Sequence, residues 1–85
     1  MKTFGYTITD EVGIHARPAG LLVKEAGKFK SSILVKANGK SADATRLMAL
    51  MALGIKCGQQ IEVSIEGEDE EDAFAGMKNF FERNL

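Results

Sequence analysis

Apolar residues repeat with two different periods along this chain, and the order of these periods constrains the fold more than any other feature. A period of two, typical of half-buried strands, runs through residues 3–8, 33–37 and 60–65, and the hairpin signal Asn38-Gly39 returns the chain into a short strand at 40–43. Helical spacing begins near Ala16 and recurs in a final helix that opens in the acidic run 68–72, with a brief helix between them at about 46–53. This order predicts an α+β fold, in which one mostly antiparallel sheet carries the helices on a single face.

Each predicted element has an identifiable buried face. In the strands it comprises Phe4, Tyr6, Ile8, Ile33, Val35, Ala37, Ile61, Val63 and Ile65. In the first helix it comprises Ala19, Leu22, Val23 and Ala26, and in the last Ala73, Phe74, Met77, Phe80 and Phe81, with Leu85 as a further candidate. Pro18 suits the first turn of a helix, where a backbone N–H has no intrahelical acceptor.

The chain is short and carries little net charge. Its 85 residues predict one domain, residues 1–85, with too small a core for a deep cleft, so that a chemical site is expected at the surface. A formal net charge of -1 argues against nucleic acid as the main partner. No apolar run approaches the ~20 residues needed to cross a bilayer, and the single cysteine forms no internal disulfide. We therefore expect a cytosolic protein.

The lone histidine, His15, comes just before the first predicted helix. The free N–H groups and the positive end of the helix dipole favour an anion there and are expected to lower the His15 pKa, which leaves a nitrogen lone pair free for attack. Arg17, in the first turn, offers a planar fork of donors to phosphate oxygens. A phosphoryl-transfer site and an ordinary surface or capping histidine are both compatible with this spacing.

Within the short helix, every residue from 47 to 53 is apolar. Leu50 and Leu53 can point inward together, which leaves Met48 and Met51 near the surface, where methionine suits contacts with several partners. The alternative is a helix that lies deeper in the core. We expect no metal site at residues 68–72, whose acids complement the helix dipole, and an inert Cys57. Lys24, Lys28 and Lys30 are expected to form a solvated face or to steer an acidic partner.

The segment Gly13-Ile14-His15-Ala16-Arg17-Pro18-Ala19 resembles the active-site signature of the histidine-containing phosphocarrier family, HPr, of the bacterial phosphoenolpyruvate-dependent sugar phosphotransferase system. The resemblance continues in Asn38-Gly39-Lys40-Ser41, Leu53-Gly54-Ile55 and Glu66-Gly67-Glu68-Asp69-Glu70 and covers nearly the whole chain. It implies an open-faced sandwich, with a four-stranded antiparallel sheet and three helices on one face.

The resemblance also implies a function. Enzyme I, charged by phosphoenolpyruvate, would phosphorylate His15 at Nδ1, with Arg17 stabilising the phosphate, and the group would then pass to a histidine of an enzyme IIA component. The partner surface would comprise Gly20, Lys24, Leu47, Met48 and Met51. Such a carrier is transiently phosphorylated rather than a stand-alone enzyme, needs no cofactor or metal, and is expected to be a monomer.

One position departs from the family pattern. Arg46 stands where many relatives carry a regulatory serine, and Thr45 is one residue out of register, so we expect kinase-dependent regulation to be absent or altered. A regulatory relative from the nitrogen-related branch and a docking-only binding module remain as alternatives. A small nucleic-acid-binding domain is disfavoured by the negative charge and the lack of an aromatic and basic face.

Overall fold

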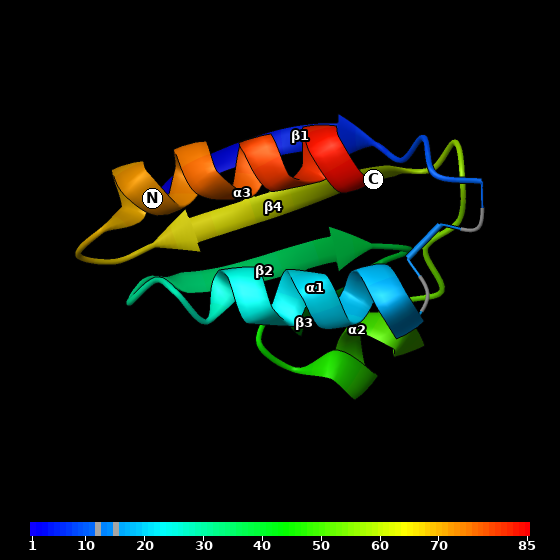
Figure 1. The fold of residues 1–85 in the computed structure, drawn as a ribbon, viewed down its shortest axis with the longest axis horizontal. Helices are drawn as coiled ribbons and strands as arrows, with labels where there is room; N and C mark the ends of the chain where they lie inside the picture. Colours follow the sequence, from blue (N-terminus) through cyan, green and yellow to red (C-terminus); the bar gives the residue numbers. More distant parts are fainter. Residues whose placement is uncertain (12, 15) are drawn as a thin grey trace.

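A computed structural model describes residues 1–11, 13–14 and 16–85 and confirms the predicted order of elements (Figure 1). The elements are β1 (Lys2–Thr7), α1 (Ala16–Ala26), β2 (Ser32–Ala37), β3 (Lys40–Asp43), α2 (Leu47–Ala52), β4 (Gln60–Glu66) and α3 (Glu70–Asn84). The strands form one antiparallel sheet in the order β1-β4-β2-β3, with three helices on one face. The predicted open-faced sandwich is therefore correct.

The strands bury the faces that their alternation predicts. Val63 of the central strand β4 lies between Phe4 of β1 and Val35 of β2, and all three side chains are buried. Ser64 points to the opposite face, yet it is buried as well. Thr3 and Leu34 lie directly across from it on the two neighbouring strands, where opposite side chains come close enough to shield one as small as serine. Alternation predicts the face of a residue but not how much its neighbours cover it.

The last helix supplies the aromatic part of the core. Phe81 is fully buried, and its ring lies 5.9 Å from that of Phe4 and 5.6 Å from that of Tyr6, measured between centroids. The side chain of Leu85 is also buried, as its place on this face suggests. The helix begins at Glu70, with Asp69 at its N-cap position, so the acids of the first turn face the positive end of the helix dipole as predicted.

Asp69 itself has a role that its sequence context does not predict. Its carboxylate accepts hydrogen bonds from the backbone N–H groups of Lys30 and Ser31 at 2.9 Å each, and from Ser31 Oγ at 2.5 Å. The bond from the Ser31 hydroxyl, and then that from the Lys30 N–H, lower the pKa of Asp69. The start of α3 is thus attached to the segment between α1 and β2.

The hairpin after β2 also positions α2. Asn38 and Gly39 have φ values of 55° and 75°, as a tight turn with two left-handed residues requires. Asn38 Nδ2 donates a 2.7 Å hydrogen bond to the carbonyl oxygen of Leu53, the residue that caps the end of α2. Because this bond holds the end of the helix, the six residues of α2 are oriented by the sheet as well as by their own core contacts.

Candidate functional site

The start of α1 lies at the same end of the molecule as the end of α3 (Figure 1). His15 and Val12 lie outside the described residues, so the predicted position of the imidazole at the surface stays a prediction. Both sequence neighbours of His15 are described: Ile14 is buried, and Ala16 is the first residue of α1.

Between β1 and α1, the described residues 8–11 and 13–14 form no helix or strand and are held by contacts with distant segments. The carbonyl oxygen of Leu85 accepts hydrogen bonds from Thr9 N, Asp10 N and Thr9 Oγ1 at 2.5, 2.9 and 2.9 Å. At the other end of the loop, Ile14 N donates to the carbonyl oxygen of Ile55 at 3.1 Å. The approach of the chain to α1 is therefore set by the end of α3 and by the segment that precedes β4.

Gly13 permits the close approach of this loop to residues 55–56. Its φ is +80°, and a Cβ atom there would lie 2.3 Å from the carbonyl oxygen of Ile55 and 2.7 Å from the Cα of Lys56. No side chain fits in that space, so the first residue of the predicted signature has a structural reason to be glycine.

Arg17 is exposed in the first turn of α1 and forms no hydrogen bond or ion pair with another described residue. It lines a surface cavity of about 300 Å³ together with Asp10, Pro18, Leu21 and Asn84. The first turn contains no acidic residue, so no carboxylate of its own neutralises the positive end of the helix dipole. The guanidinium and this helix start can therefore act together on an anionic group.

The exposed apolar residues of α2 are those that the sequence predicts. Met48 is 75% exposed, Leu47 39% and Met51 37%, whereas Leu50 and Leu53 are buried. The interpretation of this helix as deeply buried is therefore wrong. On the neighbouring helix α1, Lys24 is exposed and Gly20 half-buried.

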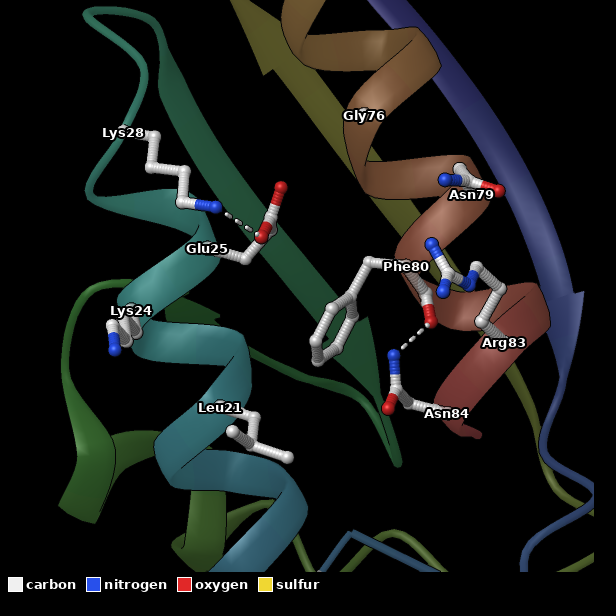
Figure 2. Close-up of a pocket in the computed structure, with 9 residues that line it drawn as sticks. All are labelled: Leu21, Lys24, Glu25, Lys28, Gly76, Asn79, Phe80, Arg83 and Asn84. Carbon is white, nitrogen blue, oxygen red and sulfur yellow. Dashed lines mark hydrogen bonds and ion pairs between the residues drawn. The ribbon is translucent and has the colours of Figure 1, made fainter.

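A groove between α1 and α3 adjoins the exposed surface of α1 (Figure 2). Its volume is about 340 Å³, and it shares Leu21 and Asn84 with the cavity beside Arg17. Lys28 Nζ donates to Glu25 Oε1 at 3.1 Å on the α1 side. Leu21 is 44% exposed and lines both the groove and the cavity. It was not among the residues predicted from the sequence. A leucine off the apolar stripe of α1 is the signal that could have identified it.

Cys57, the other candidate side chain named from the sequence, lines neither the groove nor the cavity beside Arg17. Cys57 is exposed, with its Sγ 3.8 Å from the carbonyl oxygen of Thr9. Over residues 1–11, 13–14 and 16–85, no three or more His, Cys, Asp or Glu residues gather where they could hold a metal ion. In the same part of the chain, none of the helices combines the length and apolar character needed to span a membrane.

The fold and the site define a class of protein, a small open-faced α+β sandwich in which a helix start that favours anions adjoins an exposed apolar patch. More specifically, the chain belongs to the HPr family of the phosphotransferase system, because the model of the PTS HPr component phosphorylation site matches residues 2–83.

Known relatives agree with this assignment. The chain is 44% identical over 78 residues to the phosphocarrier protein HPr of Mycoplasma capricolum subsp. capricolum, which covers 92% of this chain and 88% of that protein. It is 45% identical over 85 residues to the phosphocarrier protein HPr of Mycoplasma genitalium, covering 99% and 97%. The crystal structure of HPr-C-His from Thermoanaerobacter tengcongensis superposes with a TM-score of 0.91 at 39% identity, covering 96% and 92%. The function of the chain is that of a phosphocarrier in the phosphotransferase system.

Proposed function

We propose that His15 is the phosphoacceptor and that Arg17 stabilises the phosphoryl group during transfer and in the product. The observation that carries this proposal is the match to a phosphorylation-site family over residues 2–83, which include the only histidine of the chain. The Arg17 guanidinium, which has no partner among residues 1–11, 13–14 and 16–85 and lies in a first turn without acidic residues, supports it on physical grounds.

In the proposed reaction, His15 Nδ1 attacks the phosphorus atom carried by enzyme I. A nitrogen–phosphorus bond forms at His15 while the bond between phosphorus and enzyme I breaks. Catalysis of this kind depends mainly on positioning and charge stabilisation, which Arg17 and the start of α1 are suited to supply. A histidine of an enzyme IIA component then takes the phosphoryl group, and the neutral imidazole is regenerated.

We propose Gly20, Lys24, Leu47, Met48 and Met51 as the surface that meets both partners. Gly20 supports this proposal because glycine in a helix interior costs about 0.5–1 kcal/mol relative to alanine. Apart from the adjacent residues and the backbone of its own helix, no atom of the described residues lies within 4 Å of the position that a Cβ at residue 20 would take, so packing among them does not require this glycine. A partner that approaches the backbone closely would require it.

We further propose that the chain acts as a monomeric single domain in the cytoplasm without a cofactor. Its Cα radius of gyration, 11.3 Å, is close to the ~12 Å expected for one compact domain of this length. The relatives described above are phosphocarriers by name, which favours a carrier over a docking-only module. Transfer from the phosphorylated protein to a panel of enzyme IIA domains would separate a sugar-branch carrier from a nitrogen-branch one.

The central test is phosphorylation by enzyme I and phosphoenolpyruvate. We expect one acid-labile phosphate per chain on His15, none on His15→Ala, and a lower transfer rate for Arg17→Lys, because an ammonium cannot offer the planar fork of donors. Wild-type protein without label, or His15→Ala with equal label, would refute the assignment of the phosphoacceptor.

We also propose that serine-directed regulation at the start of α2 is absent or altered. Arg46 occupies the position expected for the serine, and Thr45 Oγ1 is engaged in a 2.6 Å hydrogen bond to Asp43 Oδ1. Incubation with the family's dedicated kinase and ATP should leave residues 45–53 unphosphorylated. Stoichiometric phosphate on this segment would contradict the proposal.

A further inference from the structure

Arg46 is exposed at the N-cap position of α2, and its side chain does not stabilise the start of the helix. The Arg46 side chain makes no capping bond, and the guanidinium forms no hydrogen bond or ion pair with any other residue that the structure describes. Serine, threonine, aspartate and asparagine are the residues that stabilise an N-cap, and a cation near the positive end of a helix dipole is unfavourable. Arginine therefore lowers the stability of the helix that it precedes.

The Asp43 carboxylate, three residues before Arg46, does not compensate for this placement. The Asp43 carboxylate accepts hydrogen bonds from the backbone N–H and the hydroxyl of Thr45, at 2.8 and 2.6 Å. The hydroxyl bond, followed by the N–H bond, lowers the pKa of Asp43, and the positive charge of Arg46 contributes less. Asp43 is thus occupied within its own turn, and the Arg46 guanidinium remains available to a partner.

The surroundings of Arg46 indicate what such a partner presents. Leu47 and Met48 follow it directly and are exposed. Lys24, on the neighbouring helix α1, is exposed and has no partner among the described residues, and α2 itself contains no charged residue. Cations thus border an apolar patch. Protein surfaces that bind one another tightly combine an apolar centre with a polar rim of complementary charge.

We propose that Arg46 is a docking residue that binds a carboxylate on the phosphoryl donor, at a face where acidic side chains surround an apolar depression. This inference rests on the proposed function, which assigns the surface of Gly20, Lys24, Leu47, Met48 and Met51 to both partners, the phosphoryl donor among them. Arg46 accelerates association and lowers KM, and it takes no part in the transfer step. A residue that weakens its own helix is thereby explained by an intermolecular contact.

The test compares full-length wild-type protein with Arg46→Glu, Arg46→Lys and Lys78→Glu. Lys78→Glu is matched in charge to Arg46→Glu and lies on α3, away from α2, where Lys78 Nζ sits 5.9 Å from the centre of the Phe74 ring. For each protein, KM and kcat for phosphorylation by enzyme I and phosphoenolpyruvate are measured at low salt and at 1 M salt. Calorimetric binding to unphosphorylated enzyme I gives a second, independent readout, and thermal unfolding confirms folding.

We expect Arg46→Glu to raise KM and the dissociation constant about tenfold at low salt with kcat unchanged, and Lys78→Glu to alter both by less than about twofold. The difference should shrink at 1 M salt, where the Debye length is about 3 Å, and Arg46→Lys should retain most of the affinity. Equal effects of the two glutamate variants would refute the inference, as would an unchanged dissociation constant for Arg46→Glu. If the wild type binds enzyme I but carries no phosphate on His15, the proposed function fails, while the binding data alone decide the role of Arg46.

Discussion

Replacing Gly13 by alanine tests whether the close approach of the loop before α1 to residues 55–56 supports both stability and transfer. The new Cβ would lie 2.3 Å from the carbonyl oxygen of Ile55, far inside van der Waals contact. Both neighbours are backbone atoms, so neither can rotate away as a flexible side chain would. The loop must move, and with it the 3.1 Å hydrogen bond from Ile14 N to the same carbonyl oxygen.

The loss of unfolding free energy follows from three contributions. A left-handed conformation costs a residue with a Cβ about 1–2 kcal/mol. Reduced freedom of the unfolded chain offsets about 0.4–1 kcal/mol of this. Forcing extra volume into a packed site costs about 1–3 kcal/mol more. Together these give a destabilisation of about 3 kcal/mol, a large share of the 5–15 kcal/mol typical of a small domain.

Gly54→Ala is the matched control. Gly54 also has a positive φ, +67°, but beyond its two chain neighbours no atom of the described chain lies within 4 Å of its Cβ position, so only the backbone contribution applies. Urea denaturation of the two variants should show a loss of about 1 kcal/mol for Gly54→Ala and about 3 kcal/mol for Gly13→Ala. At a temperature where both are folded, only Gly13→Ala should be phosphorylated more slowly by enzyme I. Equal losses of stability in the two variants would refute the packing argument.

Two further predictions concern α1 and α3. Gly20→Ala should raise the free energy of unfolding by about 0.5–1 kcal/mol, because a Cβ meets open space in a helix interior, and should weaken binding to enzyme I; lower stability in urea would contradict this. Asp69 has a folded pKa below its ordinary value of 3.8, so its carboxylate stabilises the fold above about that pH, and this contribution is lost as the pH falls through the folded pKa. Asp69→Asn should therefore unfold at a lower temperature than wild type at pH 7, with a smaller difference in acid; a difference independent of pH would show that the charge is not responsible.

Local periodicity was enough to predict the elements of the fold. The alternation through Ile61, Val63 and Ile65 predicts β4, and the spacing of Ala73, Met77 and Phe80 predicts the buried face of α3. Such patterns depend only on the geometry of residues two to four positions apart, which the sequence states directly. The same reasoning correctly separated the exposed Met48 and Met51 from the buried Leu50.

The candidate site was predictable in part. The role predicted for Arg17 follows from its place in the first turn of a helix, and that helix begins where the sequence predicts. The signature around Arg17 identified the family. The hydrogen bonds from Thr9 and Asp10 to the carbonyl oxygen of Leu85 were not predictable, because they join residues about 75 positions apart. The burial of Ser64 and the bonds of Asp69 to Lys30 and Ser31 have the same origin, since they depend on segments that only the packed sheet and helices bring together.

By itself, the sequence determined where strands and helices form, which face of each is buried and which family the chain resembles. Only the tertiary structure decided which distant backbone groups hold the loop before α1, why Gly13 admits no side chain, and that Arg46 is left without a partner among the described residues. The physical reason is that hydrophobic periodicity acts over a few residues, whereas hydrogen bonds and close contacts between distant segments exist only once those segments have packed.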